Sequence, residues 1–294
     1  MPETCKICGG ALVLQLAVKV RSVHSATLKR CTACGLLGFD QVFWLDEAYK
    51  NPINPSDVGY VFRNVNSANI LADLLFRAGM PVGYYLDYGA GYGMFVRLMR
   101  DRGYYFHGVD SYCESLFASL SEGSKKRFGE YELVSAFEVF EHLVDPVASV
   151  KEMLEYGKAV IFTTDLVPDP VPAIDDWDYY GLEHGQHVAF WTKRSLASLA
   201  GHFGLEYSNL DWISSSWHLI APKGYCLHAQ IGRDNRIRRW SKKLGFEKEP
   251  ERPQSLLMRD YKRVVEAEMH RVGSGAVSDE HFHLDDHDPI VRPK

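Results

Sequence analysis

Residues 85–110, YLDYGAGYGMFVRLMRDRGYYFHGVD, decide the fold of this chain. An apolar run ends at Asp87, glycines follow at every second position from residue 89 to residue 93, and a segment with helical spacing leads to a second apolar run ending at Asp110. This order predicts a strand, a tight turn, a helix over residues 94–102 and a second strand. Such a βαβ unit is typical of nucleotide-binding α/β folds.

The glycine spacing separates two classes of ligand. A dinucleotide-binding turn carries its third glycine three residues after its second, so that a pyrophosphate can sit on the helix N-terminus. That position is Met94 here, and the pattern is DxGxGxG. It resembles motif I of the class I S-adenosylmethionine (SAM) methyltransferases, whose glycines let the backbone approach a cofactor that has no phosphate. The alternative is an ordinary strand-end turn, where Gly and Asp are common for backbone reasons.

The resemblance implies a Rossmann-like class I methyltransferase sheet with helices on both faces, and it assigns cofactor roles by position. Asp87 matches the motif I acid that helps hold the amino group of SAM, and Asp110 matches the acid that accepts hydrogen bonds from the ribose. Glu138 lies in FEVFEHLVDP, which resembles the motif IV region on the sulfonium side, where an acid favours the positive charge. The cofactor-binding residues expected are Asp87, Gly89, Ala90, Gly91, Gly93, Asp110, Ser111 and Glu138.

Four of the six cysteines lie near the N-terminus as two CxxC pairs, Cys5 with Cys8 and Cys31 with Cys34, each followed by glycine. Two such turns supply four thiolates for a tetrahedral Zn²⁺ ion. The residues between the pairs alternate as a hairpin would. A closed site of four cysteines has no open position for substrate, so a structural zinc ribbon is expected. Redox dithiols and an iron–sulfur cluster are the alternatives, and neither has supporting neighbours.

Composition narrows the class of protein. The 294 residues carry 33 basic and 38 acidic side chains, a net charge of −5, so no global charge favours nucleic acid or an anionic membrane. No apolar run is long enough to span a bilayer, and the first residues lack a signal-peptide pattern. A cytoplasmic location is therefore expected, in which cysteines are thiols or metal ligands. A second copy of the chain stays open as a partner.

The expected division of the chain is linear. It consists of a zinc ribbon over residues 1–44, a linker and helix over 45–80, a SAM-binding domain over 81–222, a helical extension over 223–275 and an unstructured tail over 276–294. Within the extension, a basic helix is expected at residues 233–243 and an amphipathic helix at 256–272. A short helix is expected after Asp110, and a short or degenerate third strand at residues 126–128.

Residues 166–195 form a loop too long to be a mere connection, and such loops are usually lids or binding loops. His187 suits a general base, because an acceptor hydroxyl must lose a proton and an imidazole titrates near neutral pH. The alternative, that His187 only ties the lid by hydrogen bonds, stays open. The other candidates are Glu138 and Tyr180 as catalytic residues, Trp177, Tyr179 and Tyr180 as a lid over the acceptor, Glu183 and His184 as weaker bases, and Glu141 and His142 as residues that orient their loop.

Within the long loop, residues 187–191 read HVAFW, an HxxFW pattern. The order of ribbon, SAM domain and HxxFW lid resembles the zinc-ribbon methyltransferases that modify sugars on nucleotide carriers or growing glycans. That resemblance implies glycan biosynthesis and a small-molecule acceptor, a sugar. The deoxysugar C-methyltransferases of this group carry a further large C-terminal domain that residues 223–294 do not match, which favours O-methyl transfer. Two alternatives stay open: an rRNA or tRNA methyltransferase, and a non-catalytic SAM-binding protein. The rRNA guanine methyltransferases end their ribbon with a histidine, where this chain has Cys34.

Overall fold

The computed structural model describes residues 4–50, 57–80, 83–119, 129–227 and 252–274. The chain forms two compact units. Unit 1 comprises Met1–Asp57 and Arg127–Lys223, and unit 2 comprises Val58–Lys126 and Gly224–Lys294. Both units are therefore built from segments that are far apart in the sequence. The linear division into five parts stays a prediction.

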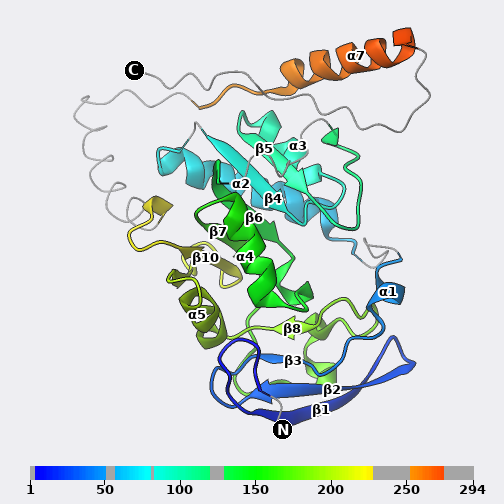
Figure 1. Ribbon diagram of the computed structural model, residues 1–294, viewed down its shortest axis with the longest axis vertical. Coiled ribbons are helices and arrows are strands. Elements are labelled where there is room, and N and C mark those ends of the chain that lie inside the picture. The colour runs from blue at the N-terminus through cyan, green and yellow to red at the C-terminus, as the bar shows by residue number, and fades with distance from the viewer. Residues whose placement is uncertain (1–3, 51–56, 81–82, 120–128, 228–251, 275–294) are drawn as a thin grey trace. The chain divides into compact units, whose positions relative to one another are not determined.

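Unit 2 contains the βαβ element predicted from residues 85–110 (Figure 1). Its elements are α2 (Tyr60–Arg77), β4 (Tyr84–Tyr88), α3 (Met94–Asp101), β5 (Tyr105–Val109) and α7 (Leu257–Ser274). Strands β4 and β5 are parallel, with Leu86 opposite His107. Fully buried apolar side chains of α2, α3 and β5 form the core, because each helix turns its apolar stripe inward. The strand–turn–helix–strand prediction is confirmed.

The short helix expected after Asp110 is wrong over residues 111–118, which form bends and irregular backbone. The Asp110 carboxylate accepts hydrogen bonds from the backbone N–H groups of Tyr112 and Cys113. The carbonyl of Tyr92 accepts from the backbone N–H groups of Leu116 and Phe117. These donors are bonded outside any helical ladder, so a polar side chain has displaced the helix that propensity favours.

The larger sheet of unit 1 has the strand order β6-β7-β10-β9. The strands are β6 (Tyr131–Phe137), β7 (Val160–Thr163), β9 (Glu206–Asn209) and β10 (Trp217–Ala221). Strands β6 and β7 are parallel, and β10 is antiparallel to both β7 and β9. Helix α4 (Pro146–Tyr156) contacts β6, and α5 (Lys193–Gly201) contacts β9. Thr192 caps α5, and its side chain accepts from the N–H of Ser195.

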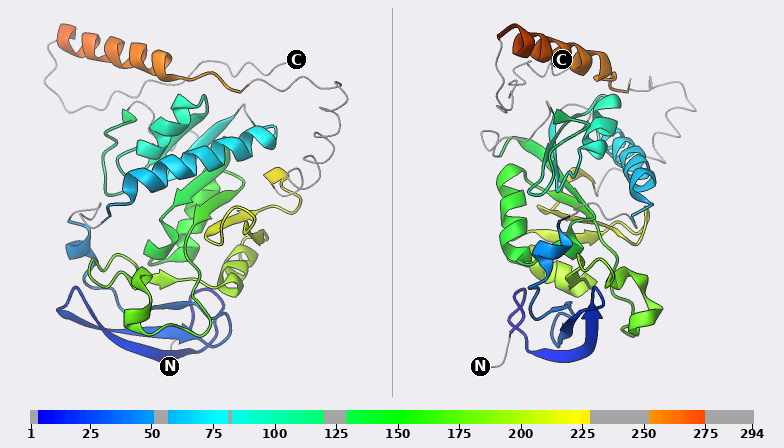
Figure 2. Two further views of the ribbon diagram at one scale, coloured as in Figure 1. Left: turned by 180° about the vertical axis from the view of Figure 1, so that it is seen from behind. Right: turned by 90° about the vertical axis from the view of Figure 1, so that its right-hand side faces the viewer.

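A second sheet of unit 1 carries the N-terminal residues in the order β1-β2-β3-β8 (Figure 1). Strands β1 (Leu12–Val20) and β2 (His24–Cys31) form the predicted long hairpin, seen from two further directions in Figure 2. Strand β3 (Leu37–Phe39) pairs with β8 (Ala189–Phe190), which comes from the long loop. Short helix α1 (Leu45–Ala48) follows. The ribbon thus shares its sheet with the loop that was expected to be a lid.

The core beneath this small sheet is also shared. Val20, Leu28 and Trp44 of the ribbon segment pack with Tyr180 and Phe190 of the long loop. All five side chains are at most 1% exposed. Because the ribbon cannot bury its apolar face alone, the loop supplies the other half of the core.

Some expectations fall outside the described residues: the basic helix at residues 233–243, the tail at 276–294 and the strand at 126–128. The amphipathic helix expected at 256–272 is confirmed by α7. Among the described residues, no helix has the length and apolar character that crossing a membrane requires.

Candidate functional site

The turn between β4 and α3 in unit 2 is organised by the carboxylate of Asp110. Its Oδ2 accepts from the N–H of Gly91 at 2.8 Å, and its Oδ1 accepts from Tyr112 and Cys113 at 2.7 and 2.8 Å. A carboxylate offers about four lone-pair positions, so a further donor can still bind. Asp110 can therefore hold the turn and accept from a hydroxyl of a ligand.

Two glycines of this turn are needed for different reasons. Gly93 has φ +79°, and a Cβ there would lie 2.3 Å from the Ser115 Oγ and 3.3 Å from Ala118. Gly91 has φ +54°, but a Cβ there would meet only the hydroxyl of Tyr60, at 3.8 Å, among the described residues. Gly93 is required by packing within the protein, whereas Gly91 leaves its backbone open to a ligand.

The other predicted cofactor residues of unit 2 lie on the same turn or at the end of β5. Asp87 is the penultimate residue of β4 and is 4% exposed. The N–H groups of Gly89 and Ala90 both donate to the carbonyl of Val109, at 2.9 and 3.1 Å. Ser111 is exposed directly after Asp110. The structure thus brings these residues together into one surface that fits a small cofactor held by backbone and carboxylate groups.

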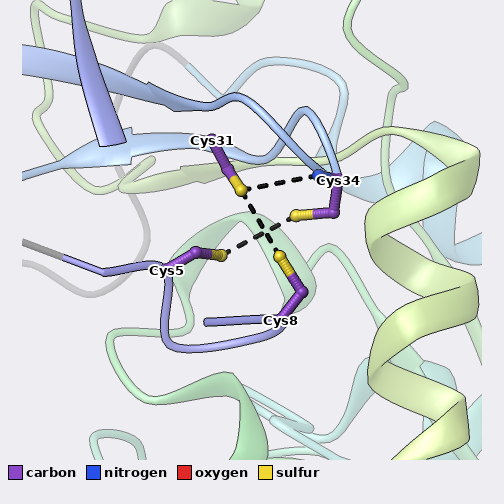
Figure 3. Close-up of side chains that lie close together, drawn as sticks. All are labelled: Cys5, Cys8, Cys31 and Cys34. Carbon is purple, nitrogen blue, oxygen red and sulfur yellow. Dashed lines mark hydrogen bonds between the residues drawn. The ribbon is translucent and has the colours of Figure 1, made fainter. Parts of the chain in front are cut away.

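The four N-terminal cysteines of unit 1 converge on one point (Figure 3). The Sγ atoms of Cys5 and Cys34 are 3.7 Å apart, and those of Cys8 and Cys31 are 3.4 Å apart. Four thiolates around Zn²⁺, each about 2.3 Å from the ion, have sulfurs about 3.8 Å from one another. The cluster is therefore compatible with a closed, tetrahedral zinc site.

The backbone around the cysteines also suits thiolate ligands. The N–H of Cys34 donates to the Sγ of Cys31. The hydrogen bond from Cys34 lowers the pKa of Cys5 to about 5, so one thiolate forms readily. A Cβ at Gly10 would lie 2.8 Å from the Cβ of Ala33, so only glycine allows the two turns to approach. The geometry of both CxxC turns is therefore compatible with binding of one shared metal ion.

Glu138 occupies a strained position directly after β6. Its φ is +55°, in the left-handed region that a side chain with a Cβ rarely adopts. The hydroxyl of Thr163, at the end of β7, accepts from the N–H of Glu138 at 3.1 Å and donates to its carboxylate at 2.8 Å. Because carboxyl ends of parallel strands meet at one edge of a sheet, Thr163 could have been found from the sequence.

Three further residues of unit 1, Glu141, His142 and His187, bring their nitrogen and oxygen ligand atoms within 4.8 Å of one another. Glu141 is fully buried, and neither of its carboxylate oxygens has a hydrogen bond of good geometry among the described residues. Burial raises the pKa of Glu141 to about 8, and the nearby charge of Glu138 adds to the shift. Burial lowers the pKa of His142 to about 4, so its ring is neutral at pH 7.

The aromatic residues of the long loop do not share one environment. The hydroxyl of Tyr180 donates to the carbonyl of Pro172 at 2.9 Å, and its side chain belongs to the core under the ribbon. Tyr179 instead accepts from the N–H of Asp165 at 3.0 Å and has a pKa raised by burial and by the charges of Glu141 and Glu138. Tyr179 is thus the tyrosine of this pair that lies with the acidic residues.

Ribbon residues fix the segment that carries His187. The indole N–H of Trp44 donates to the carbonyl of Gly185 at 2.8 Å. The hydroxyl of Thr192 donates to the backbone carbonyl of Cys34 at 2.7 Å. The hydroxyl of Tyr49 lies 3.0 Å from the Nδ1 of His142. No local pattern marks Tyr49, because it reaches His142 only through the tertiary fold.

The chain is similar to one family of known proteins and to several solved structures. The profile of the family described as "Methyltransferase domain" matches residues 63–210. The plantazolicin methyltransferase BpumL in complex with SAH is 13% identical with a TM-score of 0.39, and the match covers 61% of this chain and 94% of that one. The magnesium protoporphyrin IX methyltransferase (ChlM) from Synechocystis PCC 6803 with bound SAH is 11% identical, with a TM-score of 0.40 and coverages of 60% and 92%.

A third solved structure, the human N-acetylserotonin methyltransferase in complex with SAM, is 11% identical with a TM-score of 0.37 and coverages of 61% and 66%. None of these likenesses bears on the acceptor. No curated protein matches the chain by sequence. The family profile spans just over half of the chain and includes the glycine turn, so the chain belongs to the Methyltransferase domain family and is a SAM-dependent methyltransferase.

Proposed function

We propose that this methyltransferase transfers the methyl group of SAM to a hydroxyl of a small molecule, a sugar on a nucleotide carrier or a glycan intermediate. The observation that carries the proposal is the orientation of His187. Its Nδ1 lies 2.6 Å from the carbonyl of Tyr179, so Nδ1 carries the proton and donates. Nε2 is then the basic nitrogen, which suits it to activate a hydroxyl near neutral pH.

The proposal gives SAM binding to the unit 2 residues on the glycine turn and at the end of β5. Asp110 accepts from the ribose hydroxyls, Asp87 favours the positive amino group, and the backbone of Gly91 lies along the cofactor. By the resemblance of its segment to motif IV, Glu138 has a carboxylate that favours a sulfonium charge. Bound SAM supplies an electrophilic methyl group, and the protein has only to orient an oxygen in line with the methyl–sulfur bond and deprotonate it.

The acceptor assignment rests on the resemblance of the ribbon and the HxxFW segment to sugar methyltransferases. The net charge of −5 also disfavours a nucleic-acid acceptor, since phosphates are held by surplus Lys and Arg. The four cysteines hold a structural Zn²⁺ in this proposal. Trp177, which is half-buried beside Tyr179, is the aromatic face on which a sugar ring would pack.

A screen of nucleotide sugars and glycan intermediates with methyl-labelled SAM tests the proposal. We expect a labelled ether product, and His187→Asn should lower kcat about 100-fold or more while the Kd for SAM is unchanged. His184→Asn is the matched control, because Asn can still accept from the N–H of Gln186, as His184 Nδ1 does. Tight RNA binding that weakens steeply with salt, without turnover of any sugar, would refute the proposal.

A further inference from the structure

The group formed by Glu141, His142 and His187 has a feature that a merely structural role does not explain. Glu141 is fully buried, and neither carboxylate oxygen has a hydrogen bond of good geometry among the described residues. The hydroxyls of Tyr179 and Thr164 lie close enough to offset part of the rise in its pKa. Leaving a buried polar group without a partner is destabilising, and more so when the group is charged. Each of the two imidazoles has a ring nitrogen within 4.8 Å of a carboxylate oxygen of Glu141.

Both histidines are oriented so that the same nitrogen carries the lone pair. Nδ1 of His142 lies 3.0 Å from the carbonyl of Gln186, and Nδ1 of His187 lies 2.6 Å from the carbonyl of Tyr179. A carbonyl only accepts, so each ring is protonated at Nδ1 and has its lone pair on Nε2. Backbone carbonyls bonded to the second ring nitrogen are the usual outer contacts of histidines that ligate metals.

We propose that Glu141, His142 and His187 bind a divalent first-row transition cation, such as Zn²⁺ or Mn²⁺, which holds the acceptor hydroxyl at an open coordination position. Two imidazoles and one carboxylate form a donor set that suits these ions and leaves positions for water or substrate. Bonds of about 2.1 Å place neighbouring ligand atoms about 3.4 Å apart, so atoms within 4.8 Å of one another need to approach by at most about 1.4 Å.

This site differs from the cysteine cluster in the chemistry of its ligands. Four thiolates close the coordination sphere of a structural ion, whereas three nitrogen and oxygen ligands do not. The two clusters lie in the same unit, and Gln186, beside His187, donates through its amide to the carbonyl of Ala48 in α1. The segment after the ribbon therefore supports the outer contacts of the second site.

The cation gives the methyl transfer a defined activation step, and this step rests on the function proposed above. The bound hydroxyl has a lowered pKa, its O–H bond breaks, and the proton passes to water. The oxygen then forms the O–CH₃ bond as the methyl–sulfur bond of SAM breaks, which leaves neutral S-adenosylhomocysteine. In this refinement of the proposed function the Nε2 lone pair of His187 binds the cation, so the proton that the direct route would give to Nε2 passes to water instead.

Titration of the full-length protein with Co²⁺ and Zn²⁺, followed by elemental analysis, tests the site without a substrate. We expect two equivalents of metal, of which only one shows the sulfur-to-cobalt absorption of thiolate ligands. Glu141→Gln and His187→Asn should each weaken the second equivalent at least about 10-fold and leave the first intact. His184→Asn should change neither. Asn at position 187 keeps a donor for the Tyr179 carbonyl, so this variant tests the ligand even if Glu141→Gln does not fold.

A single equivalent that is lost only when a cysteine is replaced would overturn the proposal. So would methyl transfer that continues unchanged after the second equivalent has been removed. Failure of the proposed function is distinguishable, since two equivalents with the expected variant pattern, but no methylated sugar, would leave the metal site in place and refute the acceptor class alone.

Discussion

The glycine turn of unit 2 and the Glu141 cluster of unit 1 are built in opposite ways. The turn closes within the stretch from Asp87 to Cys113, and backbone N–H groups satisfy the carboxylate of Asp110. The cluster draws on α1, on the turn after β6 and on two parts of the long loop, and its carboxylate has no hydrogen bond of good geometry among the described residues. The side chains of a local site are held by contacts within one segment. Those of a dispersed site depend on the tertiary contacts that hold several segments together.

The strongest test of that dependence is removal of a zinc ligand. Cys31→Ser should destabilise the ribbon sheet by more than about 5 kcal/mol, because the binding free energy of a structural zinc ion is folding free energy. Hydrogen exchange should then rise in β1, β2 and the segment carrying His187, but not in the glycine turn. Cys226→Ser, outside the cluster, is the control. Unchanged exchange near His187 would show that the dispersed site stands without the ribbon.

The next test concerns how unit 2 fixes α7. The guanidinium of Arg100, which is fully buried, donates to both carboxylate oxygens of Asp260 at 2.8 Å, and Arg97 donates to the same carboxylate at 2.7 Å. Asp260→Asn leaves these charges uncompensated and should cost about 3–5 kcal/mol in a denaturant titration. Asp101→Asn removes only a half-exposed partner of Arg97 and should cost less than about 1 kcal/mol. Equal losses would contradict a buried anchor.

The same ion pair predicts that part of the free energy of unfolding is lost at acid pH. Burial alone would raise the pKa of Asp260, but the hydrogen bonds and charges of Arg100 and Arg97 outweigh burial and lower it. Because the folded-state pKa lies below the unfolded value, the stabilisation is complete above the ordinary pKa of aspartate and is lost as pH falls through the folded-state value. Thermal unfolding should therefore show wild type and Asp260→Asn converging at acid pH. A constant difference would contradict the ion pair.

Replacing the organising acid of the turn should have a smaller effect on stability than on binding. Asp110→Ala removes the acceptor of three backbone N–H groups and should cost about 1–3 kcal/mol. The Kd for SAM should rise at least about 10-fold, measured by calorimetry, because the turn and the ribose acceptor are lost together. Asp101→Ala, on the exposed side of α3, is the control. Unchanged SAM affinity would refute the ribose assignment.

The fold was predictable from the sequence where contacts between residues close in the sequence determine the structure. The βαβ unit, the ribbon hairpin and the amphipathic helix α7 each follow from spacing that one segment carries alone. The prediction failed after Asp110, where the carboxylate bonds the N–H groups that a helix would need. The sequence also could not show that β8 joins the ribbon sheet, because that pairing connects residues that lie far apart in the sequence.

The residues of the candidate site also fall into two groups, those that belong to a local sequence motif and those that only the tertiary fold brings together. Asp110 and the four cysteines were found because each belongs to a short motif with fixed spacing. Tyr49 lies in the cluster only through its contact with His142. Tyr179 and Tyr180 are adjacent in the sequence, yet one lies with the acids and the other packs under the ribbon. No periodicity tells two such neighbours apart, since the backbone turn between them decides which way each points.

The last prediction measures the backbone strain at Glu138, whose carboxylate accepts from the hydroxyl of Thr163. Glu138→Gly and Glu138→Ala both remove the carboxylate, but only Ala keeps a Cβ at φ +55°. Because the left-handed conformation costs a residue with a Cβ about 1 kcal/mol or more, the Gly variant should be the more stable by about that amount in thermal unfolding. Both variants should lose methyl transfer equally, since neither has the carboxylate. If Gly instead keeps the activity that Ala loses, the backbone conformation, and not the carboxylate that Thr163 holds, is what the reaction requires.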